Sequence, residues 1–343
     1  MLTPDFPPGR GGIQQLLGRL AGELTGASLT VVSLAQHRDP GSVVGSNLDR
    51  SVDGRVLRLP VPGVIGQRAR VVIFNLASLV VALLRRPDVV LVGHIVAVPA
   101  ARVIARILRR PYVLILHAQE LPNRPGLMRS GVHRSAATIA VSSHTRSEAE
   151  RLGADSRKIV VINPGVDLPA TAGEQPVIAT KSDDHRPTIV TIARMVDRYK
   201  GHDVMTDAVE RLRRRGLNPL WIVAGEGPLR SGYQREVAER GLNCCISFTG
   251  AVDDAQRERL LTQADVFAMP SRVPAGGGGE GFGLVYLEAA ARGLPVVAGN
   301  EGGAVDAVRD GETGLLVDPR DARAVADALA RLLVDRDLAA EMG

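Results

Sequence analysis

The sequence has few aromatic residues, few lysines and only two cysteines. Phe, Trp and Tyr make up 3% of the 343 residues, which argues against the stacked aromatic platforms that bind single-stranded nucleic acid. Cys244 and Cys245 are adjacent, so they offer neither a disulfide framework nor a four-thiolate metal site, and a reducing compartment is expected. No basic start leads into an apolar run near Met1, so no signal peptide is predicted and a cytoplasmic location is expected.

Long hydrophobic runs and strand-end Asp-x-Asp pairs are also missing. The most apolar stretch, residues 71–84, contains Asn75 and Ser78 and falls short of the roughly 20 apolar residues that span a bilayer. We therefore expect a buried or interfacial helix there. The single Asp335-Arg-Asp337 lies in a terminal helical pattern, so no metal site is predicted and cationic side chains are expected to do a metal's work.

Charge is divided unevenly along the chain. Residues 1–170 carry 21 Lys+Arg against 11 Asp+Glu, a balance of +10, whereas residues 171–343 carry 21 against 26, a balance of −5. The basic first half suggests contact with an anionic surface, such as lipid head groups, although solvated arginine faces in an arginine-rich proteome explain the charge equally well. Nucleic acid is not expected as a partner, because no binding motif accompanies the charge. The arginines on or near predicted helices are Arg68, Arg70, Arg85, Arg86, Arg102, Arg106, Arg109 and Arg110.

Short β-branched or apolar runs alternate with helical patterns, which predicts doubly wound parallel α/β sheets. The pattern occurs twice, predicting one domain over residues 1–167 and a second over residues 187–343, joined by a linker at 168–186 that has no periodicity. Expected strands are 29–34, 89–92, 113–116, 138–141, 159–162, 188–192, 220–224, 246–249, 266–269, 295–298 and 315–317. Expected helices include 13–24, 68–84, 98–108 and 145–152.

The most informative segment is Glu280-Gly-Phe-Gly-Leu-Val-Tyr-Leu-Glu288. Its glycines Gly281 and Gly283 let the backbone approach a ligand and expose the first amides of a helix, where an anion such as a diphosphate is favoured. Glu280 precedes this helix and Glu288 lies in its second turn, where both carboxylates suit sugar hydroxyls. By itself, the segment would also fit a helix entry with acidic N-terminal charge.

Several further motifs, in the same order along the chain, resemble the retaining nucleotide-sugar glycosyltransferases of family 4. The resemblance implies the GT-B fold, in which two Rossmann-like domains face a cleft and the second domain mainly holds the donor. It covers nearly the whole chain, but both ends look short: only four residues precede Asp5, and a C-terminal helix returning to the first domain is not expected. The matching motifs are Asp5-Phe-Pro-Pro8, Gly11-Gly-Ile-Gln14, Ala193-Arg-Met195, Tyr199-Lys-Gly201, Ala224-Gly-Glu-Gly-Pro228, Ala264–Ser271, Gly302-Gly303 and Gly311–Leu315.

The resemblance also implies roles for individual residues. Arg194 and Lys200 would bind the donor diphosphate, with Gly11 and Gly12 approaching it from the first domain. Glu280, with the amides of Gly281, Phe282 and Gly283, would bind the sugar ring and phosphate, and Glu288 the donor ribose. Gly225 and Val252 would flank the nucleobase. His117 would contact the transferred sugar, although Ala118 stands where glycine is common and a strand-terminal histidine can simply bond to backbone. His94 is a weaker candidate for acceptor contact, and His202 is expected to cap a helix.

The implied reaction is hexose transfer with retained configuration, without metal or cofactor, to a hydroxyl acceptor. The motifs look closest to the phosphatidylinositol mannosyltransferase branch, which favours GDP-mannose as the donor, a membrane glycolipid acceptor and a peripheral position at the inner face of the plasma membrane. A UDP-sugar donor, a non-catalytic nucleotide-sugar binder and a GT-B-fold sugar-nucleotide epimerase stay open, as does the oligomeric state. A phosphorylase is poorly supported, since only Lys158, Lys181 and Lys200 could carry its pyridoxal group.

Overall fold

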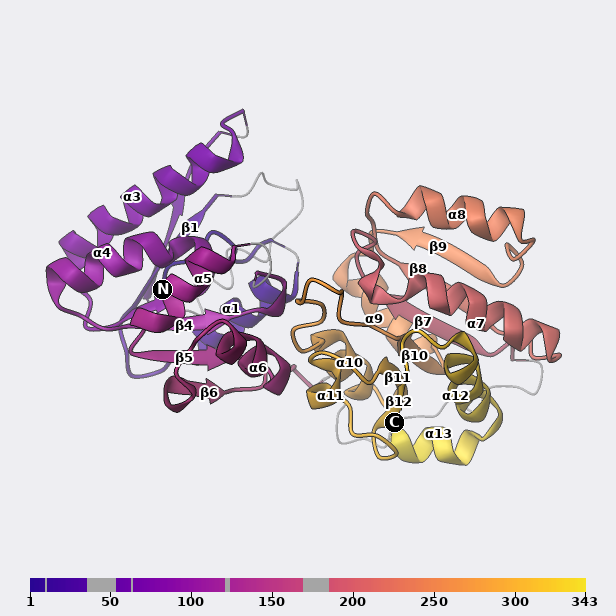
Figure 1. The fold of residues 1–343 in the computed structure, drawn as a ribbon. Coiled ribbons are helices and arrows are strands. Elements are labelled where there is room, and N and C mark those ends of the chain that lie inside the picture. Colours follow the sequence, from indigo (N-terminus) through magenta and orange to yellow (C-terminus); the bar gives the residue numbers. More distant parts are fainter. Residues whose placement is uncertain (10, 36–53, 63, 121–123, 169–184) are drawn as a thin grey trace. The chain divides into compact units, whose positions relative to one another are not determined.

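The chain folds into two compact units, Met1–Asn163 (unit 1) and Pro164–Gly343 (unit 2) (Figure 1). The computed structural model describes residues 1–9, 11–35, 54–62, 64–120, 124–168 and 185–343. The linker expected at 168–186 lies almost wholly outside these ranges.

The sheet of unit 1 is parallel throughout. Strand β1 pairs with β2, and β3, β4, β5 and β6 pair in that order. The bounds are β1 Leu29–Leu34, β2 Gly54–Leu59, β3 Val90–Val92, β4 Tyr112–Leu116, β5 Ala137–Ala140 and β6 Ile159–Val161. Leu2 bridges Val32 of β1 and Val92 of β3, so the residues before Asp5 fill the place of a first strand between these two. The four residues that precede Asp5 are thus represented in the sheet by two bridges from one residue.

Helices cover this sheet because each presents an apolar stripe toward it. Phe74 of α3, Ile104 of α4, Met128 of α5 and Ala149 of α6 all enter one buried cluster with the strands. Their bounds are α1 Gly12–Glu23, α3 Gln67–Arg85, α4 Val98–Leu108, α5 Pro125–Arg134 and α6 Ser143–Arg151, with 3₁₀ turns at Ile95–Ala97 (η1), Ala118–Glu120 (η2) and Ser156–Lys158 (η3).

Unit 2 is a six-stranded parallel sheet in the order β12-β11-β10-β7-β8-β9. The strand order reverses between β7 and β10, because β8 and β9 follow on one side of β7 and β10, β11 and β12 then follow on its other side. The strands are β7 Thr188–Ile192, β8 Leu220–Ala224, β9 Ile246–Gly250, β10 Val266–Met269, β11 Val296–Gly299 and β12 Gly314–Val317. The helices are η4 Arg198–Lys200, α7 His202–Arg214, α8 Arg230–Glu239, α9 Asp254–Gln263, α10 Leu284–Ala290, α11 Ala304–Ala307, α12 Ala322–Val334 and α13 Arg336–Met342.

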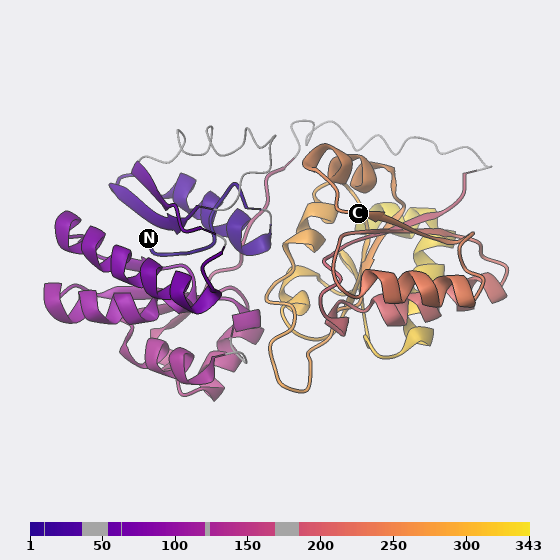
Figure 2. The same cartoon turned by 90° about the horizontal axis from the view of Figure 1, so that it is seen from above.

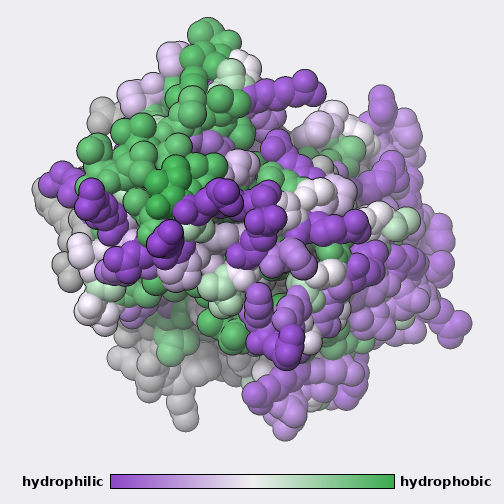
Figure 3. All heavy atoms as spheres, turned by 60° about the vertical axis from the view of Figure 1, so that its left-hand side comes forward, coloured by the Kyte–Doolittle hydropathy of each residue, from purple (hydrophilic) through white to green (hydrophobic). Residues whose placement is uncertain are grey.

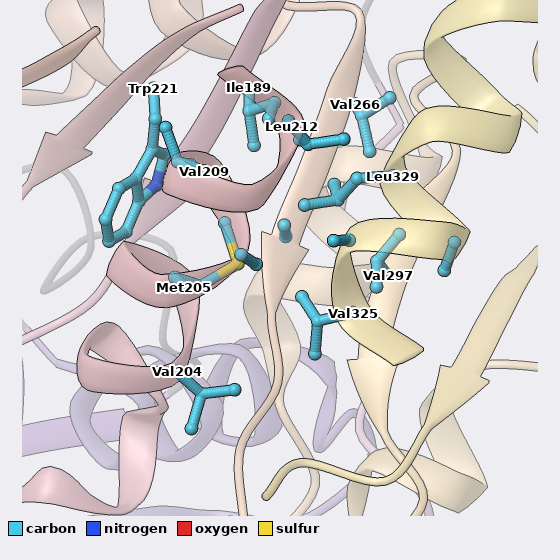
Figure 4. Close-up of a cluster of buried hydrophobic side chains, with 14 of the residues drawn as sticks. Ile189, Val204, Met205, Val209, Leu212, Trp221, Val266, Val297, Val325 and Leu329 are labelled. Atoms are coloured by element: carbon cyan, nitrogen blue, oxygen red, sulfur yellow. The ribbon is translucent and has the colours of Figure 1, made fainter. Parts of the chain in front are cut away.

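Helices cover both faces of the unit 2 sheet (Figure 2). One face buries side chains of α7, α8 and α12 around Met205 and Leu329, as Figure 4 shows. The other buries Leu261 of α9 with Tyr286 and Ala289 of α10. Trp221 is fully buried beside the first cluster, and its indole N–H donates to Thr191 Oγ1 at 2.9 Å.

The predicted fold class, two doubly wound parallel α/β units, is confirmed. All eleven predicted strands are present with bounds shifted by no more than two residues at either end. Strand β2 was missed, since its six residues include Arg55 and Arg58 and carry no continuous apolar run. Parallel hydrogen bonding to β1 stabilises this segment as a strand.

Candidate active site

The sheet order of unit 2 places its candidate residues together. In an open parallel sheet, ligands bind beyond the carboxyl ends of the strands where the strand order reverses. That point lies between β7 and β10. The segment after β7 carries Arg194 and Lys200, and the segment after β10 carries Glu280. Topology therefore explains why residues 80 positions apart in the sequence meet.

The two segments pack backbone against backbone. The Arg272 N–H donates to Tyr199 O at 2.8 Å. Gly201 has φ of 78°, a left-handed conformation that favours glycine, and a Cβ there would clash with the Pro270 carbonyl. Arg272 also forms a two-point ion pair with Asp203, at 2.6 and 3.1 Å. These contacts fix the backbone on either side of Lys200.

Lys200 and Glu280 form an ion pair. Lys200 Nζ lies 2.5 Å from Glu280 Oε2, and the two side chains are 15% and 12% exposed. Nζ also lies 5.0 Å from the centre of the Tyr199 ring. Burial opposes the charged form, but Glu280 and Tyr199 outweigh it, so the pKa of Lys200 is raised and its ammonium is held charged.

Arg194 lies on the same edge of the sheet, in the segment that follows β7, and its side chain is exposed. Burial raises the pKa of Tyr199, and the positive charges of Lys200 and Arg194 oppose that rise. The structure thus brings Lys200 and Glu280 into contact and places Arg194 on the same edge of the sheet.

The glycine-rich segment before α10 is held by its own close contacts. Gly283, the residue before α10, has φ of 92°, and a Cβ there would clash with the Tyr286 ring. The Tyr286 hydroxyl is 2.8 Å from Met269 O and 2.8 Å from Ser271 Oγ. Gly303 N–H donates to Glu280 O at 2.8 Å. The backbone from Glu280 to Gly283, with Gly281 and the buried Phe282 between them, is therefore fixed by neighbouring loops.

Glu288 lies in the second turn of α10, as the sequence predicted, and is buried. Arg257 of α9 approaches it, with Nη1 3.3 Å from Glu288 Oε1. Sequence reasoning missed Arg257, because only the packing of α9 beside α10 brings it near. No local motif could have revealed it.

The loops after β8 and β9 carry the two remaining donor-side residues. Gly225 has φ of 146° and lies against the Ala193 carbonyl, leaving no room for a Cβ. Its N–H donates to Gly250 O at 2.8 Å, which joins the two loops. Val252 follows β9 and is half-buried. Both residues lie on the edge that carries Arg194.

His202 does not cap a helix, contrary to the expectation from sequence. It is the first residue of α7, and Gly201 precedes it without any side-chain cap. Both ring nitrogens are buried without a hydrogen-bond partner among the described residues, and burial lowers the pKa of His202 to about 4. The ring instead packs against Tyr233, with 5.5 Å between ring centres.

Unit 1 carries the other candidates at the carboxyl edge of its own sheet. Helix α1 begins at Gly12. Gly11 before it has an extended backbone and, being glycine, no side chain that could cap the helix. His117 follows β4 and is buried, and its Nε2 lies 3.1 Å from the Gly93 carbonyl. Burial lowers the pKa of His117, which favours the neutral ring, and Nε2–H donates a hydrogen bond to that carbonyl. This is the backbone bond that the sequence left open as the alternative for this residue.

A second polar group lies beside it. His94 Nε2 is 2.8 Å from Glu120 Oε1 and 3.5 Å from Asp5 Oδ2. Asp5 was noted from the sequence only as part of a motif, and no role was predicted for Glu120. Their positions could still have indicated a site, because Asp5 and Glu120 both follow parts of one parallel sheet at its carboxyl edge.

Within the described ranges, no group of three or more His, Cys, Asp or Glu side chains lies placed to hold a metal ion.

Comparison with known proteins gives both the class of this protein, a glycosyltransferase, and its family. The family described as "Glycosyltransferase Family 4" matches residues 10–169, and "Glycosyl transferases group 1" matches residues 176–343. The "GDP-mannose-dependent alpha-(1-6)-phosphatidylinositol monomannoside mannosyltransferase" of Mycobacterium tuberculosis is 34% identical, over 100% of this chain and 91% of its own length. The protein of the same description from Mycolicibacterium smegmatis is also 34% identical, with the same coverage. The chain belongs to glycosyltransferase family 4.

Solved structures agree on the fold. Anabaena Alr3699/HepE, in complex with UDP and glucose, has a TM-score of 0.76 with 20% sequence identity, over 98% of this chain and 90% of that chain. At this identity the likeness supports the GT-B fold alone.

Proposed function

We propose that this protein transfers mannose from GDP-mannose to a hydroxyl of a phosphatidylinositol-based glycolipid, with retained anomeric configuration and without a metal ion. Whole-chain similarity to two mycobacterial mannosyltransferases supports the donor and the acceptor class. The observation that carries the proposal is the ion pair of Lys200 and Glu280 at the reversal point of the unit 2 sheet, with Arg194 on the same edge.

The donor diphosphate would lie against Arg194 and Lys200. As the bond to the sugar breaks, negative charge develops on the leaving phosphate, and preorganised cations stabilise it. Lys200 is already charged and held by Glu280 and Tyr199, so little reorganisation is needed. Glu280 and the backbone of Gly281, Phe282 and Gly283 would then bind the sugar ring and phosphate.

Further residues would complete the donor contacts. Glu288, oriented by Arg257, would accept hydrogen bonds from ribose hydroxyls. Gly225 and Val252 would flank the guanine base. Gly11 and Gly12 would offer the start of α1 to the phosphates, and His117 would contact the mannose. The acceptor hydroxyl would enter on the face from which the diphosphate departs, and the phosphate would take its proton.

We further propose that unit 1 binds the surface of an anionic membrane through α3 and α4. Helix α3 is long and apolar enough to cross a bilayer by length and composition, whereas the sequence had suggested that it falls short. Its Phe74, Ser78 and Ala82 are nevertheless buried in unit 1. Among the described residues, the opposite face of α3 exposes the large apolar side chains Val72, Ile73, Leu76, Val80, Leu83 and Leu84.

The surroundings of this apolar face suit a lipid surface with negative head groups. Val103 and Ile107 of α4 extend the exposed apolar area. Figure 3 shows this green area bordered by hydrophilic side chains. The exposed arginines on these helices and just beyond them are Arg68, Arg85, Arg86, Arg106, Arg109 and Arg110. Apolar side chains would enter the acyl boundary while guanidinium groups pair with lipid phosphates, and such a surface would suit a peripheral position at the inner face of the plasma membrane.

Replacing Leu76 and Val80, 60% and 55% exposed, by glutamate should weaken binding to vesicles containing phosphatidylinositol at least tenfold. Sedimentation with vesicles measures this, and Val334→Glu is the control, since Val334 is 66% exposed on α12 of unit 2. Equal binding of the double variant and wild type would contradict the proposed membrane face.

The activity itself is tested by incubating the purified protein with GDP-mannose or UDP-glucose, with and without phosphatidylinositol monomannoside in detergent micelles. We expect GDP release that depends on GDP-mannose and on the acceptor, and an α-linked product. Activity should persist in EDTA. Donor binding without turnover would favour a non-catalytic nucleotide-sugar binder, and conversion of the donor alone to its epimer would favour an epimerase.

A further inference from the structure

We propose that Asp5, His94 and Glu120 of unit 1 form a binding site for hydroxyl groups of the acceptor, in which His94 holds the two carboxylates in position. This inference rests on the proposed function and names the part of the chain that recognises the polyol head group.

The fold brings these three residues to one edge. Asp5 follows the bridge that Leu2 makes between β1 and β3, His94 follows β3, and Glu120 ends the 3₁₀ turn after β4. Carboxyl ends of neighbouring parallel strands lie side by side, and this edge is where open α/β sheets bind their ligands. The residues are thus placed by three separate segments.

The hydrogen bonds of His94 determine which of its ring nitrogens carries the proton. Nδ1 accepts a hydrogen bond from the Val96 N–H at 3.2 Å, so Nδ1 has no proton of its own in this arrangement. Nε2 therefore carries the proton and lies near both carboxylates, 2.8 Å from Glu120 Oε1 and 3.5 Å from Asp5 Oδ2. Gln14 adds a second donor to Asp5, with Nε2 3.3 Å from Oδ1.

Glu120 is left with unused capacity to accept hydrogen bonds. Its side chain is 5% exposed, and neither Oε1 nor Oε2 receives a hydrogen bond from the part of the chain that is described. A buried carboxylate oxygen without a donor is costly, and one ligand O–H would remove that cost. Asp5, 32% exposed, lies across the imidazole and could accept from a second hydroxyl.

The charges favour hydroxyls over other ligands. Two carboxylates on one imidazole repel a phosphate. A metal ion would need the lone pair of Nε2, which carries the proton here, and no group of three or more His, Cys, Asp or Glu among the described residues is placed to hold one. A polyol offers neutral O–H donors, which suit two acceptor carboxylates.

The test compares Glu120→Gln and His94→Gln with wild type, using GDP-mannose and phosphatidylinositol monomannoside micelles. Glutamine keeps the shape of Glu120 but replaces one acceptor oxygen with a donor. We expect the KM for the acceptor to rise about tenfold or more, as for the loss of one hydrogen bond to a charged group. The KM for GDP-mannose should stay within about twofold. Asp88→Asn is the control, since Asp88 is 88% exposed and lies before β3.

The melting temperature distinguishes this site from a structural one. Because Glu120 receives no hydrogen bond from the described residues, its neutral replacement should leave the melting temperature unchanged or higher. A lower melting temperature with equal rises in both KM values would show a structural role and overturn the proposal. So would an unchanged KM for the acceptor, or a KM that rises only for GDP-mannose. If wild type uses no GDP-mannose at all, the proposed function fails first, and that result is seen before any variant is made.

Discussion

Lys200→Ala should lower kcat for mannosyl transfer about 10²- to 10³-fold, the usual effect of removing one group that stabilises a developing anion. Lys200 is held charged by Glu280, at 2.5 Å, and by the Tyr199 ring. Without it, Arg194 is the remaining cation proposed to hold the leaving diphosphate. Steady-state GDP release at saturating donor and acceptor measures the effect.

A matched control and a double variant separate catalysis from folding. Lys158→Ala removes an exposed lysine from unit 1 and should have no effect on kcat. Lys200→Ala alone leaves the Glu280 carboxylate, 12% exposed, without its counter-charge, so the melting temperature should fall. Adding Glu280→Gln should recover stability but not activity. A kcat for Lys200→Ala within threefold of wild type would refute the phosphate role.

Gly283→Ala should abolish most donor binding and destabilise unit 2 by about 1–3 kcal/mol. Gly283 has φ of 92°, which alanine adopts with strain, and its Cβ would meet the Tyr286 ring. That ring cannot move away easily, because its hydroxyl bonds to Met269 and Ser271 and Tyr286 is fully buried. The segment carrying Glu280 would have to shift instead. Calorimetric titration with GDP-mannose and thermal unfolding measure the two effects.

Gly276→Ala is the control for this substitution. Gly276 lies in the same glycine-rich segment, yet a Cβ there meets no atom within 4 Å. Its affinity for GDP-mannose and its melting temperature should match wild type. If both alanine variants weaken binding equally, flexibility of the whole segment, and not the fixed turn at Gly283, controls the donor site.

Much of the fold could be predicted, because both units use local signals that repeat. Strands such as β7 and β8 are uninterrupted apolar runs between helical patterns, as expected for buried parallel strands. Strand β2 lacks that signal, and only pairing with β1 stabilises it. The bridges made by Leu2 likewise depend on tertiary structure, and the few residues before Asp5 form no pattern that predicts them.

The candidate site divides in the same way. Glu280, Gly283 and Glu288 stand in one continuous motif, so spacing alone located them on α10 and the turn before it. The pairing of Lys200 with Glu280 depends on strand order, which sequence patterns do not fix. Arg257 and Glu120 depend on packing between separate segments, and His202 was misjudged because burial, not capping, decides its environment.

Helix α3 has apolar residues on both faces, with Phe74 inside unit 1 and Leu76 outside. The same helix that completes the core would then also be the lipid anchor, so attachment and folding of unit 1 are thermodynamically linked. Vesicles should raise the thermal unfolding temperature of the protein. In plain buffer the uncovered face would promote self-association, and mild detergent during purification should keep the protein monodisperse.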